Sequence, residues 1–149
     1  MSEIAIEMAA SEQVVLPVLT SLNHGNIDDA IARFAEEFTF NDRGIGLEFK
    51  DKGQLTDFFE ETREHFPDSS LQVDSILVSL DHVVSEWTLH TYVREPFYGE
   101  SSRKVPILLH GVSVVRTRNG EITEWSDYYD GLTSRRTALA AHFADWREF

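Results

Sequence analysis

The chain has 149 residues and a mass of 17.0 kDa, a size that fits one globular domain over residues 1–149. It contains no cysteine, which excludes disulfides, thiolate metal sites and cysteine nucleophiles. The formal net charge is −13; such a surface repels phosphate backbones and anionic lipids, so we expect neither nucleic acid nor a membrane as partner.

The first residues, "MSEIAIEMAASEQ", carry acids where a signal peptide would carry Lys or Arg. No apolar run approaches the ~20 residues that a membrane-spanning helix needs. We therefore expect a cytoplasmic protein.

Helices are expected in the first half of the chain. "SEQVVLPVLTSLNHGN" predicts a first helix, with Ser11 as a candidate N-cap and Gly25 near its end. In residues 27–38 apolar side chains recur at helical spacing, which predicts a second short helix. "TFNDRGIGLEFK" reads as two small strands around a turn, and residues 51–68 predict a third helix.

After the third helix the period of apolar residues changes from 3.6 to 2, which indicates strands. Four strands are predicted, over residues 71–80, 82–93, 105–118 and 121–129. Asn119 and Gly120 are a strong hairpin signal between the last two. Asp130 and Gly131 break the last strand, and a C-terminal helix is predicted from about residue 132.

This order predicts an α+β domain in which helices pack across a curved antiparallel sheet. A strongly curved sheet with helices over its open side forms a cone. The cavity inside such a cone is a natural site for a small apolar ligand.

Three stretches resemble a known superfamily: "GVSVVRTRNGEITEWSDYYD", "FTFND" and "KGQLTDFFEETREHFPD". Over roughly residues 10–135, the layout is similar to the nuclear transport factor 2-like (cystatin-like) superfamily. Within it the chain resembles the group that contains SnoaL-like polyketide cyclases and limonene-epoxide hydrolase. One scaffold of this kind hosts many chemistries, so the resemblance implies the fold more specifically than the reaction.

The resemblance also implies roles for particular residues. Asp127 matches the aspartate that helps to activate water in the epoxide hydrolases, and Asn41 matches the asparagine that holds that water. The hydrolases' Arg-x-Asp pair is replaced here by Thr88 and His90, which leaves a His–Asp pair rather than an epoxide hydrolase site. Members of this superfamily commonly pair through the open sheet face, so the resemblance also implies a homodimer.

Asp127 shares strand parity with Trp125 and Tyr129. If that face lines the cavity, partial desolvation raises the pKa of Asp127, which suits a general base or acid near neutral pH. The alternative is a solvated or arginine-paired carboxylate at the sheet edge. Asp130, before "GLTSRR", is better suited to a turn or a helix cap.

The resemblance places His90 and Thr88 inward, and an imidazole can pass protons at working pH. The alternative is a surface histidine. His110 lies on the facing strand, but a one-residue register slip would move it to the other face, so whether it joins the site stays open and no metal site is assigned.

The sequence therefore predicts a cofactor-independent acid–base enzyme of isomerase, cyclase, dehydratase or hydrolase type. Its substrate would be a small, apolar, oxygenated molecule. Asp127 and His90 are the expected catalytic pair, and the expected ligand-binding residues are Asn41, Thr88, Trp125 and Tyr129. The alternative is a non-catalytic small-ligand-binding or dimerisation module of the same fold.

Overall fold

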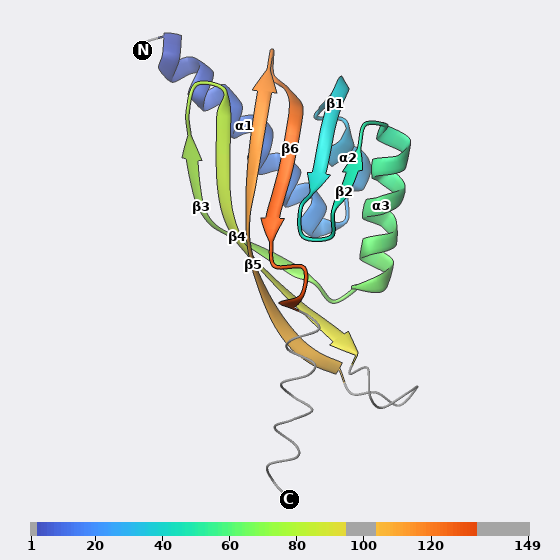
Figure 1. The fold of residues 1–149 in the computed structure, drawn as a ribbon. Helices are drawn as coiled ribbons and strands as arrows, with labels where there is room; N and C mark the ends of the chain where they lie inside the picture. Colours follow the sequence, from blue (N-terminus) through green and yellow to red (C-terminus); the bar gives the residue numbers. More distant parts are fainter. Residues whose placement is uncertain (1–2, 95–103, 134–149) are drawn as a thin grey trace, which may run out of the picture.

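The structure, a computed structural model, describes residues 3–94 and 104–133. Its elements in chain order are α1 (Glu3–His24), α2 (Ile27–Ile31), β1 (Phe34–Asp42), β2 (Leu47–Phe49), α3 (Lys52–His65), β3 (Ser70–Val78), β4 (His82–Arg94), β5 (Lys104–Arg118) and β6 (Glu121–Tyr129). Figure 1 shows the helices packed against a single sheet. The α+β class predicted from the sequence is confirmed.

The six strands lie in the order β2-β1-β6-β5-β4-β3. The predicted meander of β3 to β6 is confirmed, since each of its neighbours pairs antiparallel. The sheet as a whole is mixed, because β1 runs parallel to β6. This pairing satisfies backbone groups along β6 that would otherwise form an exposed edge.

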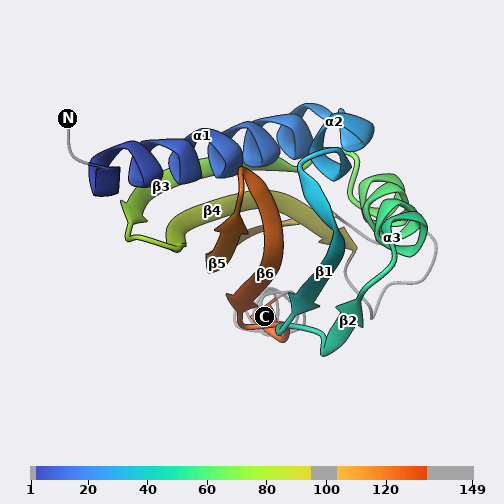
Figure 2. The same ribbon diagram turned by 90° about the horizontal axis from the view of Figure 1, so that it is seen from above.

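One face of the sheet, which we call the inner face, is covered by helices. The apolar side of α1 packs there through Val14, Val15, Val18 and Leu19, all of which are buried. Figure 2 shows α1 crossing the curved sheet, with α3 beside β2. The opposite side of the sheet is called the outer face below. In the described ranges, no helix is long and apolar enough to span a membrane.

The first helix is longer than predicted. It begins at Glu3, so Ser11 lies inside the helix and is not its N-cap. Residues 3–10 are rich in Ala and Glu, which are good helix formers. Gly25 has a φ of 77°, the left-handed conformation that commonly ends a helix, as the sequence predicts.

The second helix is shorter than predicted. It ends at Ile31, and Phe34–Asp42 forms a strand instead. Phe34 and Phe38 are both buried, and their four-residue spacing fits a strand as well as a helix. Pairing of this aromatic-rich segment with β6 decides the outcome.

The turns at both ends of β6 agree with the sequence. Asn119 and Gly120 have φ values of 53° and 78°, the two positive angles of a type I′ hairpin. After β6, the backbone nitrogen of Leu132 donates a hydrogen bond to Asp130 Oδ1 at 3.0 Å, so Asp130 is a turn residue as predicted. The predicted C-terminal helix falls largely on residues 134–149, outside the described residues.

Candidate functional site

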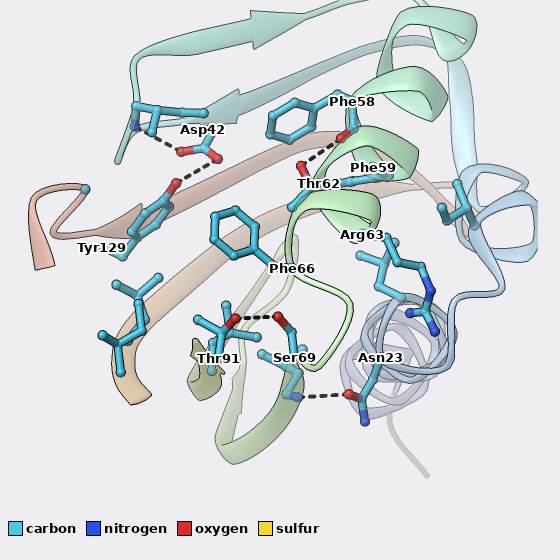
Figure 3. Close-up of a pocket in the computed structure, with 18 residues that line it drawn as sticks. Asn23, Asp42, Phe58, Phe59, Thr62, Arg63, Phe66, Ser69, Thr91 and Tyr129 are labelled. Carbon is cyan, nitrogen blue, oxygen red and sulfur yellow. Dashed lines mark hydrogen bonds between the residues drawn. The ribbon is translucent and has the colours of Figure 1, made fainter. Parts of the chain in front are cut away.

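A cavity of about 360 Å³ lies between the inner face and the helices. Its walls are mostly apolar, with Phe58, Phe59 and Phe66 on one side and Leu89 and Leu109 from the sheet (Figure 3). A cavity of this size and lining suits a small, largely apolar molecule.

Asp42 and Tyr129 form the polar part of the cavity wall at one end (Figure 3). The Tyr129 hydroxyl donates to Asp42 Oδ2 at 2.9 Å. The backbone nitrogens of Gly44 and Ile45 donate to Asp42 Oδ1 at 3.1 and 3.2 Å. Three donors therefore hold this carboxylate in place.

The Tyr129 ring lies directly over Gly44. A Cβ atom at Gly44 would come within 2.2 Å of that ring, so a larger residue there would displace it. Burial and then the hydrogen bond to Asp42 raise the pKa of the Tyr129 hydroxyl. The hydroxyl therefore stays protonated at neutral pH and acts as a donor.

Asp127 lies beside Asp42, its partner in the parallel β1–β6 ladder. Its Oδ1 accepts hydrogen bonds from Ser113 Oγ at 2.5 Å and from Trp125 Nε1 at 2.7 Å. Burial raises the pKa of Asp127 to about 6, the hydrogen bonds from Ser113 and Trp125 oppose the rise, and the charge of Asp42 adds to it. Asp127 therefore changes protonation near neutral pH.

Ser113 connects Asp127 to a second indole. Trp87 Nε1 donates to Ser113 Oγ at 2.9 Å, and Ser113 donates onward to Asp127. The sequence reasoning missed Ser113, Trp87 and Asp42 as site residues. The sequence did carry a signal for two of them. Ser113 is a polar residue within an otherwise apolar strand, and Asp42 is the last residue of the "FTFND" segment.

Asn41 does not reach the cavity. It is buried, and its side-chain nitrogen donates to Ser126 Oγ at 3.1 Å. Because side chains alternate along a strand, Asn41 and Ser126 face the outer side while Asp42 and Asp127 face inward. Asn41 was expected to hold a water beside Asp127. That expectation is wrong, because the neighbouring residue Asp42, and not Asn41, shares the face of Asp127.

His90 also lies on the outer face. In the ladders, Asp127 pairs with Ser113 and Ser113 with Ser85, so odd-numbered residues of β4 share the face of Asp127. His90 has the other parity and is exposed. The expected His90–Asp127 pair is therefore wrong, because Trp87 and Leu89 fill the inward positions that the resemblance gave to Thr88 and His90.

Thr88 and His110 meet on the outer face. Thr88 Oγ1 donates to Asp74 Oδ2 at 2.7 Å and lies 3.1 Å from His110 Nδ1. Neither residue lines the cavity, so His110 does not join the group around Asp127. Within residues 3–94 and 104–133, no cluster of three or more His, Asp or Glu side chains forms a candidate metal site.

Of the remaining expected ligand-binding residues, Tyr129 lines the cavity and Trp125 does not. Trp125 is buried in the core, with its ring centroid 6.1 Å from that of Phe34. It contacts the site through the hydrogen bond from its Nε1 to Asp127. The structure thus brings Asp127, Trp125 and Tyr129 onto one face, with Asp42 beside them.

Residues 12–137 match the sequence profile of a family described as SnoaL-like polyketide cyclase. No curated protein matches the sequence. The fold is similar to that of a protein of Jannaschia sp. CCS1 named as a SnoaL-like polyketide cyclase, with a TM-score of 0.76 and 19% identity over 94% of this chain and 96% of that one.

Two further solved structures contain small molecules. A protein of Catenulispora acidiphila with a ketosteroid isomerase-like fold, in complex with trimethylamine, has a TM-score of 0.72 and 20% identity over 85% of this chain and 92% of that one. TerC, co-crystallised with polyporic acid, has a TM-score of 0.71 and 13% identity over 87% of this chain and 98% of that one. The profile match covers most of the sequence, and the chain therefore belongs to the SnoaL-like polyketide cyclase family.

Proposed function

We propose that the protein is a cofactor-independent acid–base enzyme that acts on a small, apolar, oxygenated molecule bound in the cavity. The reaction is a proton transfer of isomerase, cyclase, dehydratase or hydrolase type. The observation that carries this proposal is the position of Asp127 beside Asp42, which lines the cavity; burial raises the pKa of Asp127 to about 6. General bases work best when their pKa lies near the working pH.

Asp127 is the base in this proposal. Both of the hydrogen bonds from Ser113 and Trp125 end on Oδ1, so Oδ2 is the oxygen that takes the proton. Asp127 is only partly buried, and its ladder partner Asp42 lines the cavity, so the ligand or water on which it acts would lie beside Asp42. Asp42 and the protonated Tyr129 hydroxyl position that ligand or water.

The apolar walls bind the rest of the molecule and exclude bulk water. The solved structures of this fold with trimethylamine and with polyporic acid support small-ligand binding at such a scaffold.

The test uses small apolar ketones, such as 2-tetralone, whose α-carbon protons exchange with solvent when a base removes them. Deuterium incorporation in heavy water, followed by proton NMR, measures proton abstraction directly. We expect the wild-type protein to accelerate exchange for part of such a panel, and Asp127→Asn to reduce the enhancement by about 100-fold or more. The rate of the wild-type protein should rise with pH and level off above about pH 6.

Asp57→Asn is the matched control, since Asp57 is an exposed aspartate on α3. It should leave the exchange rate unchanged. An Asp127→Asn protein that exchanges ketone protons as fast as the wild type would exclude Asp127 as the base.

The second candidate is a small-ligand-binding module without catalysis. The observation in its favour is that Asp42 and Tyr129 line the cavity whereas Asp127 does not. Binding of the ketones by the wild-type protein, without exchange above the buffer rate for any of them, would favour this function.

We also propose that the outer face pairs with a second copy of the chain. Leu77, Tyr92, Leu108 and Tyr128 stand exposed on it, and Leu108 is 52% exposed. Exposed apolar patches of this kind on a sheet commonly mark protein interfaces. The nuclear transport factor 2-like resemblance points to the same partner.

A further inference from the structure

The polar groups of the cavity differ in kind from one end to the other. Asp42 and Tyr129, with Asp127 close by, supply oxygen atoms at one end. Arg63 and Asn23 lie on the opposite side of the cavity, at the end near α1 (Figure 3). A ligand that spans the cavity therefore meets the Asp42 carboxylate and the Tyr129 hydroxyl at one end and nitrogen donors at the other.

Hydrogen-bond donors at the α1 end stay available within the part of the chain that the structure describes. Asn23 Oδ1 accepts a hydrogen bond from the backbone nitrogen of Leu71 at 2.8 Å, which fixes the side chain and leaves its amide nitrogen as the donor. The hydroxyls nearby are already engaged: Thr62 donates to the carbonyl of Phe58, and those of Ser69 and Thr91 bond to each other.

Arg63 forms no ion pair with any acid in the described part of the chain. Glu60 and Glu64 lie close to it on α3 and share a shallow surface depression with it, yet neither pairs with it. An arginine that borders an apolar cavity without a carboxylate partner has its donors available for a ligand.

The guanidinium of Arg63 is seated over Gly25. A Cβ atom at Gly25 would lie 2.4 Å from Cζ of Arg63, so a side chain at this position would displace the guanidinium. The end of α1 carries partial negative charge, which favours a cation at this place. That attraction explains the position of the guanidinium, but no hydrogen bond to the described residues uses its N–H groups.

The net charge of the chain bears on which ligands can bind in the cavity. With a net charge of −13, the surface disfavours anions unless a local cation binds them. Arg63 is the cation among the described residues that line this cavity. A guanidinium binds a carboxylate through paired N–H···O bonds, which are stronger and more directional than neutral hydrogen bonds.

We propose that the ligand of this cavity carries a carboxylate-type anionic group, held by Arg63 and Asn23 at the α1 end. Its apolar body fills the middle, and its reacting oxygenated carbon lies at the Asp127 end. The substrate class is therefore an apolar oxo acid. This inference rests on the proposed function for the location of the reacting end.

The experiment compares two probes of nearly the same shape, 2-naphthoate and its neutral amide, naphthalene-2-carboxamide. Isothermal titration calorimetry measures their dissociation constants for the wild type, Arg63→Gln and Arg118→Gln. We expect the wild type to bind the carboxylate about tenfold more tightly than the amide. Arg63→Gln should abolish that preference by weakening the carboxylate alone.

Arg118→Gln is the charge-matched control, because Arg118 is an exposed residue at the β5–β6 hairpin. It should leave both constants unchanged. A preference for the carboxylate that survives in Arg63→Gln, or is lost equally in Arg118→Gln, would overturn the inference.

The outcomes also separate this inference from the proposed function. Equal binding of carboxylate and amide by the wild type overturns the anionic ligand but leaves the ketone-exchange chemistry standing. Failure of the wild type to bind either probe overturns the inference, whereas the proposed function is judged by ketone exchange alone.

Discussion

At the scale of single residues, Asp127 links stability to the proposed chemistry. Its pKa is raised from 3.8 to about 6, mainly by burial. Between these two pH values the folded protein holds a proton that the unfolded chain releases. The free energy of unfolding therefore falls as pH rises through this window, and the full destabilisation is present above about pH 6.

Asp127→Asn tests this directly. The amide keeps an acceptor oxygen for Ser113 and Trp125 but cannot ionise. At pH 8 we expect the variant to be more stable than the wild type by up to about 3 kcal/mol, and at pH 4.5 by only about 1 kcal/mol. Urea unfolding at both pH values measures the difference, with Asp57→Asn as control. An equal gain at the two pH values would contradict the burial argument.

The shared face of three of these residues was predictable from the sequence, because side chains alternate along a strand. Trp125, Asp127 and Tyr129 lie on one strand, so alternation alone puts them on one face. His90 and Asn41 belong to other strands, where the face depends on the register of pairing. A shift of one residue exchanges Asn41 for Asp42 and His90 for Leu89, and a single sequence carries no signal that fixes it.

At the scale of elements, one row of partners crosses the sheet through the site. Ser85, Ser113, Asp127 and Asp42 lie opposite one another on β4, β5, β6 and β1. The two serines differ in their bonding. Ser113 Oγ bonds to both Trp87 and Asp127, whereas Ser85 Oγ is the buried side-chain atom without a hydrogen-bond partner in the described ranges.

Ser113→Ala and Ser85→Ala are therefore a matched pair. Ser113→Ala leaves the Trp87 N–H without its acceptor and should destabilise the protein by about 1–3 kcal/mol. It should also raise the pKa of Asp127 further, because a donor to the charged form is lost. Ser85→Ala removes an unsatisfied hydroxyl and should be neutral or slightly stabilising.

Urea unfolding at pH 7 and an NMR titration of the Asp127 carboxyl carbon measure the two effects. The hydrogen-bond assignment would be contradicted if both serine variants lost equal stability, or if the titration midpoint of Asp127 stayed at the wild-type value in Ser113→Ala.

Elements with a strong local signal were predictable from sequence. The Asn119–Gly120 turn requires two positive φ angles, and few residue pairs besides Asn-Gly adopt them readily. The segment Phe34–Asp42 was not predictable, since its spacing of aromatic residues fits two periods. Its strand structure depends on pairing with β6, about 85 residues later in the chain.

At the scale of the whole molecule, the exposed apolar side chains of the outer face lead us to expect self-association. Leu108→Glu places a charge in the middle of the exposed apolar residues and should dissociate the proposed dimer. Sedimentation equilibrium measures the change in mass. Leu80→Glu is the control, because Leu80 is also exposed but lies in the turn between β3 and β4.

A wild-type protein that sediments as a monomer at micromolar concentration would contradict the proposed pairing. So would a Leu80→Glu protein that dissociates as readily as Leu108→Glu.

The parallel pairing of β1 with β6 also affects the order in which parts of the sheet can form. Tyr129 and Asp42 are 87 residues apart in the chain, and closing so long a loop precedes any gain from their contact. During synthesis, β1 and β2 leave the ribosome long before β6 exists. The edge of β1 that pairs with β6 therefore stays open to chaperones or to misassociation until β6 is made and the cavity wall is complete.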